Sequence, residues 1–140
     1  MVLESVLTAV ITVIIGVAVY AFSQIVSKFV IEPIHKQDEI RGEIADSLIF
    51  YANIYANPGM GTPQHAAAAD KFRQLASSLM FRTQLIRKYG FFSWIGLIPE
   101  MSNVVKAHSN LIGLSNGINV REYANQNVES ADEIKKFLKI

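Results

Sequence analysis

The sequence predicts an all-α protein in which an N-terminal transmembrane helix precedes a small antiparallel bundle of about four helices. Residues 5–27 carry no charged side chain, which is typical of a membrane span. After residue 33, apolar residues recur at helical spacing, and no alternating strand pattern with hairpin turns is found. We therefore expect two parts, an anchor over residues 1–33 and a cytoplasmic domain over residues 34–140.

The composition excludes several classes of function. The chain has 140 residues, of which 18% are charged, and this length allows one compact domain with an appendage. It has no cysteine, which excludes disulfides, thiolate metal sites, iron–sulfur clusters and a cysteine nucleophile. Thirteen Lys+Arg against twelve Asp+Glu leave a net charge of +1, so we expect no nucleic-acid partner.

The apolar segment is long enough to cross a bilayer. Its 23 residues make a helix of about 35 Å, against a hydrocarbon core of about 30 Å. The alternative is a cleaved signal peptide, for which residues 19–21 offer a passable cleavage site. Glu4 argues against a signal because that region is normally basic, and the run exceeds the usual apolar core of about 7–15 residues.

The distribution of basic residues predicts the orientation of the span. No Lys or Arg precedes it, whereas Lys28, Lys36 and Arg41 follow it. Basic residues remain preferentially on the cytoplasmic side, so we expect the N-terminus outside and the C-terminal domain in the cytoplasm.

One face of the span is lined by small residues at helical spacing. Small residues allow helices to approach closely in lipid, so this small-residue face favours self-association, and Thr12 and Gly16 form a small-x-x-x-small pair. Two alternatives remain: a chance pattern, since small residues are common in spanning helices, and a hydroxyl-lined pore. The face comprises Ser5, Ala9, Thr12, Gly16, Ser23 and Ser27.

Four helices are expected after Pro33, which suits either the first turn of a new helix or a mild kink in a continuous one. They cover residues 34–56, 62–90, 99–115 and 120–138, and the second begins with Thr62 as its N-cap. The residues predicted to face inward are Ile40, Ile44, Leu48, Tyr51 and Tyr55, then Ala68, Phe72, Leu75, Leu79 and Ile86, then Val104, Val105, His108, Leu111 and Ile112, then Val120, Tyr123, Asn127, Ala131, Ile134 and Leu138.

Residues 91–99 are too few to cross a membrane and too apolar for an ordinary loop. Aromatic rings with basic neighbours suit the headgroup layer, where the rings are buried and the cations meet anionic lipid. The alternatives are a bundle corner whose rings fill the core and, with weaker support, a single-stranded nucleic-acid site. The predicted membrane-interface residues are Arg82, Arg87, Lys88, Phe91, Phe92 and Trp94.

The titratable residues give little sign of catalysis or metal binding. Glu32 and His35 have the Glu-x-x-His spacing of di-iron bundles, but neither of the other histidines has a Glu three residues before it. His108 falls on an apolar stripe, where we expect a hydrogen-bonded core or edge histidine. An acidic face that could bind a cation is more typical of a solvated helix surface and comprises Glu39, Glu43 and Asp46. We expect no catalytic residue, metal or cofactor.

Three segments have a familiar pattern: residues 42–53 (GEIADSLIFYAN), 73–77 (RQLAS) and 111–116 (LIGLSN). They resemble segments of a group of small bacterial membrane proteins of unknown function, in which an N-terminal apolar helix comes first. The resemblance extends over most of the chain up to about residue 117. It implies a bacterial inner-membrane location and carries over no catalytic residue, cofactor or substrate.

These observations predict a membrane-anchored helical interaction or scaffold protein without catalytic activity. Its expected partners are the lipid bilayer, further copies of itself and an unidentified cytoplasmic partner. The alternative is a membrane-perturbing or pore-forming effector in which the helical domain acts as sensor or gate. A weaker third hypothesis is a bundle enzyme that uses the acidic face.

Overall fold

The computed structural model describes residues 2–140, and these residues contain helices and loops but no strand. The predicted all-α class is confirmed. In chain order the elements are α1 (Val2–Val26), the π-helix η1 (Ser27–Ile31), α2 (Glu32–Phe50), α3 (Ala52–Ala56), α4 (Pro63–Gln84), α5 (Tyr89–Trp94), α6 (Met101–Gly117), the 3₁₀ helix η2 (Arg121–Tyr123) and α7 (Ala124–Leu138).

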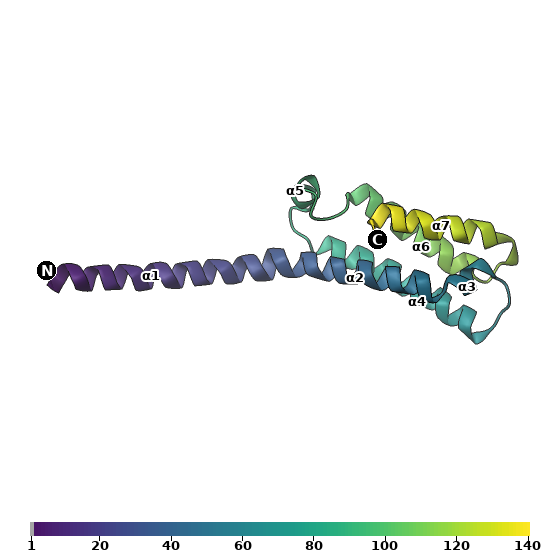
Figure 1. Cartoon of the computed structure of the whole chain (residues 1–140), viewed down its shortest axis with the longest axis horizontal. Helices are drawn as coiled ribbons and strands as arrows, with labels where there is room; N and C mark the ends of the chain where they lie inside the picture. The colour runs from purple at the N-terminus through teal and green to yellow at the C-terminus, as the bar shows by residue number, and fades with distance from the viewer. Residues whose placement is uncertain (1) are drawn as a thin grey trace.

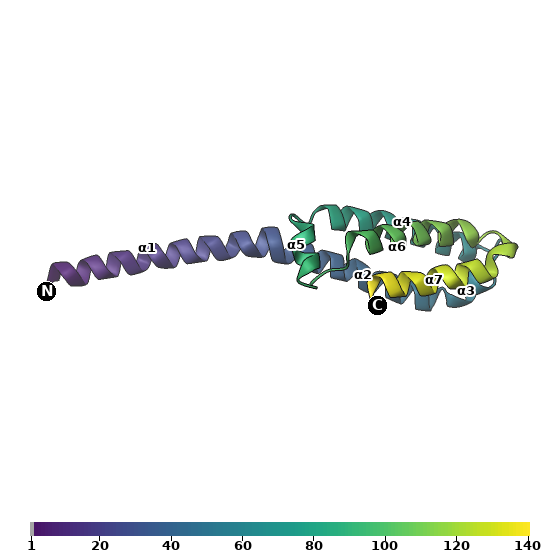
Figure 2. The same ribbon diagram turned by 90° about the horizontal axis from the view of Figure 1, so that it is seen from above.

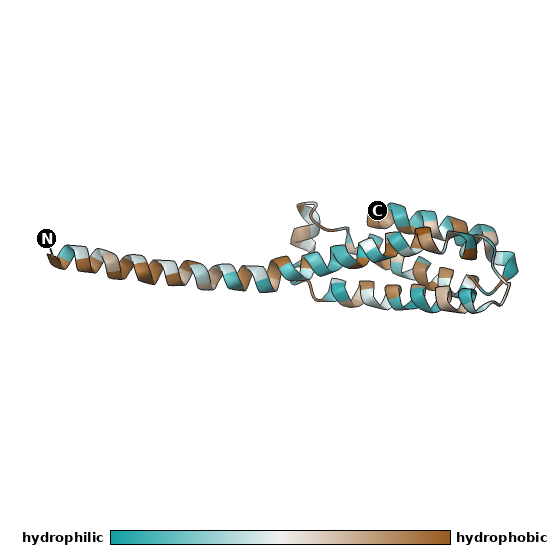
Figure 3. Cartoon of the chain, turned by 60° about the horizontal axis from the view of Figure 1, so that its bottom comes forward, coloured by the Kyte–Doolittle hydropathy of each residue, from teal (hydrophilic) through white to brown (hydrophobic). Residues whose placement is uncertain are grey.

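The first three elements form one continuous helix of 49 residues, Val2–Phe50, whose N-terminal half projects from the rest of the molecule (Figure 1). Its most apolar 18-residue window has a mean hydropathy of 2.4, and none of that window is buried. Figure 3 shows hydrophobic residues along the whole of α1, whereas the remaining helices alternate between hydrophilic and hydrophobic residues. This helix is long and apolar enough to cross a membrane.

A π-helical segment allows the long helix to pass through Pro33. In a regular α-helix the proline ring would clash with the carbonyl four residues earlier. Here the wider turns of η1 precede Pro33, and the Glu32 amide donates to the Ser27 carbonyl, five residues back. Of the two expectations for Pro33, the structure therefore has the continuous helix.

The other long helices pack beside α2 (Figures 1 and 2). Helix α4 lies between α2 and α6, α6 also packs on α7, and α3 contacts α7. Burial on the long helix begins at Gln37, and no residue of α1 or η1 is buried. We call residues 34–140 the helical body. Its proximal end is the end from which α1 extends, and its distal end is the opposite end. The largest fully buried apolar side chains are Phe72, Ile44, Leu48, Leu75, Leu79, Leu111, Leu114, Ile118, Ile134, Leu138 and Val104.

Two of the predicted helices end earlier than expected. Helix α2 ends at Phe50, because the backbone of Tyr51 leaves the helical region (φ −96°, ψ 15°), and α3 follows as a separate element. Helix α4 begins after Thr62 as predicted but ends at Gln84, so Arg87 lies in a loop rather than in the last helical turn.

Most of the residues predicted to face inward are buried, and three are exposed instead: Val105, Val120 and Tyr123. Helix α6 buries Val104 and Ala107, and this leaves Val105 facing away from the core. Helix α7 begins only at Ala124, so Val120 and Tyr123 belong to the preceding turn rather than to its buried stripe.

Two glycines of α6 provide a matched test of this packing. A Cβ at Gly117 would overlap the side-chain oxygen of buried Asn127, whose amide nitrogen donates to the Tyr55 carbonyl. A Cβ at Gly113 would meet open space. We expect Gly117→Ala to lower the free energy of unfolding by about 1–3 kcal/mol through loss of that hydrogen bond. Gly113→Ala should raise it by up to about 1 kcal/mol through helix propensity. Urea unfolding of the full chain in detergent, followed by circular dichroism, measures both, and equal effects would contradict the packing.

Candidate functional site

The short helix α5 crosses the proximal end of the helical body. Figures 1 and 2 show it beside the point where α1 leaves the body, and in Figure 2 it runs transverse to the long helix. The loop before α5 contacts the long helix directly, because the Arg87 guanidinium carbon lies 5.7 Å from the centroid of the Phe29 ring in η1. The apolar stretch around α5 is therefore next to the end of the apolar N-terminal helix.

The aromatic stretch divides into a buried side and an exposed side. Tyr89 and Ile98 are buried, and Phe92 packs partly against the core. On the other side, Trp94 is 81% exposed and Phe91 is 56% exposed, and their ring centroids lie 6.3 Å apart. We call the exposed set the α5 face, which comprises Phe91, Trp94, Ile95 and Leu97.

A buried hydrogen-bond network holds α5 in place. Tyr89 donates through its hydroxyl to the Pro99 carbonyl (2.8 Å) and accepts from the Gln37 amide (3.1 Å). The same Gln37 nitrogen donates to the Thr83 hydroxyl (2.9 Å). Burial raises the pKa of the Tyr89 hydroxyl above its ordinary value. The network thus joins α2, α4, α5 and the segment before α6.

Removal of the Tyr89 hydroxyl tests this network. Tyr89→Phe leaves the Pro99 carbonyl without its donor, so we expect the free energy of unfolding to fall by about 1–3 kcal/mol at neutral pH. Because burial raises the pKa of Tyr89, its stabilising contribution is complete below about pH 10 and is lost as the pH rises above that value.

The stability difference between wild type and Tyr89→Phe should therefore narrow at alkaline pH, as measured by unfolding curves over a pH series. Tyr123→Phe, which removes an exposed hydroxyl, is the control and should change little. A difference that stays constant above pH 10 would contradict the assignment.

The basic residues predicted for the interface separate into two groups. Arg87 and Lys88 are exposed in the loop that leads into α5, and Lys88 has a left-handed backbone (φ 58°). Arg82, on α4, is half-buried and borders a small hollow of about 70 Å³ among charged side chains of α2. Phe29 was not predicted as a site residue, although its position directly after Lys28 at the end of the apolar run could have suggested it.

The small-residue face is exposed along its whole length, from Ser5 to Ser27. Gly16 has open space around the position of a Cβ. The Thr12 and Ser23 hydroxyls donate to backbone carbonyls of their own helix, at 2.8 and 3.0 Å. Satisfied hydroxyls of this kind are compatible with an apolar environment.

Several of the histidines and acidic residues make structural contacts. Glu32 pairs with Lys36, and Glu43 lies 3.5 Å from the Lys71 amine. The expected hydrogen-bonded edge position of His108 is confirmed, because its Nδ1 lies 3.0 Å from the Ala76 carbonyl oxygen. Among residues 2–140, no group of three or more His, Asp or Glu side chains is placed to hold a metal ion.

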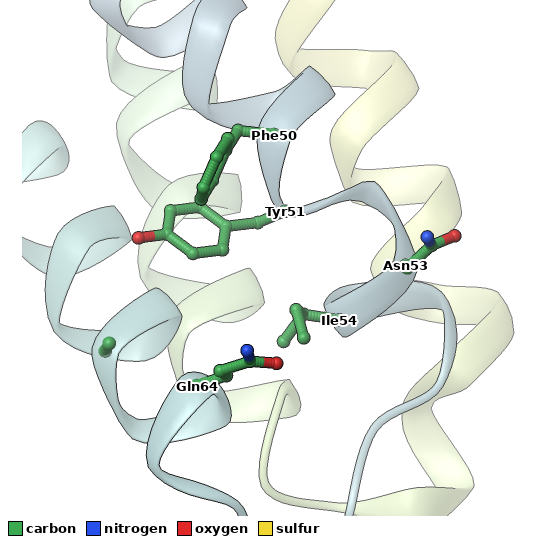
Figure 4. Close-up of a pocket in the computed structure, with 6 residues that line it drawn as sticks. Phe50, Tyr51, Asn53, Ile54 and Gln64 are labelled. Atoms are coloured by element: carbon green, nitrogen blue, oxygen red, sulfur yellow. The ribbon is translucent and has the colours of Figure 1, made fainter.

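An open cavity of about 380 Å³ lies at the distal end (Figure 4). Phe50 at its edge is 76% exposed, and the neighbouring Tyr51 ring makes an edge-on contact with it. No charged side chain lines the cavity, so it offers apolar and amide contacts rather than acid–base chemistry. Its lining residues are Phe50, Tyr51, Asn53, Ile54, Gln64 and Ala67.

Comparison with protein-family models, curated proteins and solved structures finds no match for this chain. The resemblance to a group of small bacterial membrane proteins therefore stays a prediction.

Proposed function

We propose that the protein is a membrane-anchored helical interaction protein that acts without catalysis. Residues 1–33 cross the bilayer once, and α2, α4, α6 and α7 form a small antiparallel bundle in the cytoplasm. The observation that carries this proposal is the continuity of an unburied apolar helix with the helical body. Each Val, Leu or Ile side chain that moves from water into lipid contributes about 1.5–3 kcal/mol, and α1 presents many such side chains, none of them buried.

The absence of a loop between the two parts supports a scaffold role. A flexible linker would let a tethered domain move freely, whereas a continuous helix holds the helical body at one height above the bilayer. Partners that share the membrane then meet the body in a defined geometry. We propose the lipid bilayer, a second copy of this chain and a cytoplasmic protein as the partners, in the bacterial inner membrane.

The orientation can be tested with fusions to the C-terminus. Because Lys28, Lys36 and Arg41 follow the apolar run and no basic residue precedes it, we expect a C-terminal alkaline phosphatase to be inactive. A C-terminal green fluorescent protein should be bright. The opposite pair of results would reject the cytoplasmic position of the helical body.

Self-association is proposed to use the small-residue face. Gly16→Ile would fill the open space at Gly16 with a branched side chain and keep two backbones apart, so cross-linking of the full chain should fall several-fold. Ile15→Leu changes a neighbouring, exposed position while preserving its volume and should leave cross-linking unchanged. An unchanged bacterial two-hybrid or cross-linking signal for Gly16→Ile would remove this face from the proposal.

A further inference from the structure

We infer that the α5 face is a docking surface for anionic lipid, which attaches the helical body to the membrane at a second point beside the span. This inference rests on the proposed membrane anchor. Its structural basis is the position of exposed aromatic residues next to the end of the apolar helix.

The Arg87–Phe29 contact ties the start of α5 to the end of the span. If residues 5–27 fill the hydrocarbon core, Phe29 lies about 3 Å beyond its edge, at about 1.5 Å per residue. The headgroup layer extends about 5–8 Å from that edge. Arg87 contacts the Phe29 ring, so this placement of the span brings the Arg87 guanidinium to the level of the headgroups, with α5 following two residues later in the chain.

The direction of α5 and its exposed side chains suit a membrane surface. Helix α5 runs transverse to the long helix (Figure 2), and it therefore lies along the membrane surface when the long helix spans the bilayer. Trp94 is 81% exposed, although a tryptophan ring is among the side chains that gain most from leaving water. Together with Phe91 and Leu97 it forms an apolar surface of the kind that inserts at the headgroup boundary.

Basic side chains precede α5 in the chain. Arg87 and Lys88 are exposed directly before α5, and Lys28 is exposed next to Phe29, whose ring Arg87 contacts. Glu32 is paired with Lys36 and is also attracted by Lys28. Arg87 and Lys88 are therefore the exposed cations beside α5, with Glu100 as the carboxylate that follows it in the chain. Cations near an anionic leaflet are attracted to it, and this attraction weakens as salt is added. The expected ligand is therefore an anionic headgroup such as phosphatidylglycerol rather than a neutral one.

The hydrogen bonds of Tyr89 with Gln37 and Pro99 connect α5 firmly to the rest of the helical body. Gln37 on the long helix and Tyr89 at the start of α5 bind each other in the interior, so docking of α5 restrains the tilt of the body. Phe50 lies 21 residues after Phe29 on the same helix, which places it about 30 Å further from the membrane. The distal end therefore stays in water and provides an internal control.

Depth-dependent fluorescence quenching tests the inference on the full chain. Trp94 is the only tryptophan, so its emission reports the α5 face alone. The protein is placed in nanodiscs of phosphatidylcholine with or without phosphatidylglycerol and with lipids brominated near the headgroup or deep in the acyl chain. We expect Trp94 to be quenched at least two-fold more by shallow than by deep bromines, and its emission to shift to the blue when phosphatidylglycerol is present.

Two further single-tryptophan chains separate docking from anchoring. Trp94→Phe combined with Ile14→Trp reports the middle of the span and should be quenched most by deep bromines. Trp94→Phe combined with Phe50→Trp reports the distal end, where the exposed ring should escape quenching. If the Ile14→Trp chain is quenched and Trp94 is not, docking is wrong while the anchor stands. If neither is quenched, the anchor and the docking surface both fail.

The preference for anionic lipid is tested by removing the neighbouring charges. Arg87→Gln with Lys88→Asn, which retains a residue that tolerates the left-handed backbone, should reduce Trp94 quenching in phosphatidylglycerol discs to the level in phosphatidylcholine. Arg121→Gln, an exposed cation in η2 after α6, is the matched control and should have no effect. Equal quenching of wild-type Trp94 in both lipids would overturn the anionic preference.

Discussion

The continuous helix Val2–Phe50 is the constraint on which the rest of the structure depends. One stretch of backbone has no buried side chain along α1 and then contributes Ile40, Ile44 and Leu48 to the core. Because hydrogen bonds run through the junction without a loop, the helical body cannot turn freely against α1. The position of α5 beside Phe29 and the distance of Phe50 from the apolar run both follow from this continuity.

Gln37 links the long helix to Tyr89 of α5 at the position where burial on the long helix begins. A fully buried amide is costly unless it is hydrogen-bonded; Thr83 and Tyr89 accept from the Gln37 nitrogen, whereas the Gln37 side-chain oxygen has no hydrogen-bond partner among the described residues. Apolar packing alone would tolerate many positions for a six-residue helix, whereas directional hydrogen bonds select one. The polar interior at the proximal end therefore explains why α5 presents a fixed set of side chains to the outside.

The sequence predicted the elements whose signals are local. The stripe of Ile40, Ile44 and Leu48 follows the helical period, and Thr62 before Pro63 marks the start of α4. The break at Tyr51 was missed because the apolar spacing continues undisturbed to buried Tyr55. The end of α4 at Gln84 was missed because no glycine or proline marks it, and the left-handed residue that leads into α5 is a lysine. A loop whose geometry is set by tertiary contacts has no local sequence signal that would predict it.

Composition alone does not show which side chains of the aromatic stretch, residues 89–98, are buried and which are exposed. Residues 89–98 are apolar at nearly every position, so periodicity does not separate the rings that fill the core from those that face outward. The separation depends on partners remote in sequence, since Gln37 and Pro99 draw Tyr89 inward and thereby turn Trp94 outward. The hypothesis of a core corner holds for Tyr89 and Ile98, which are buried, whereas the exposed side is the one that we propose to contact the membrane. Burial on one side fixes the helix, so that the proposed docking surface on its exposed side is held in one orientation.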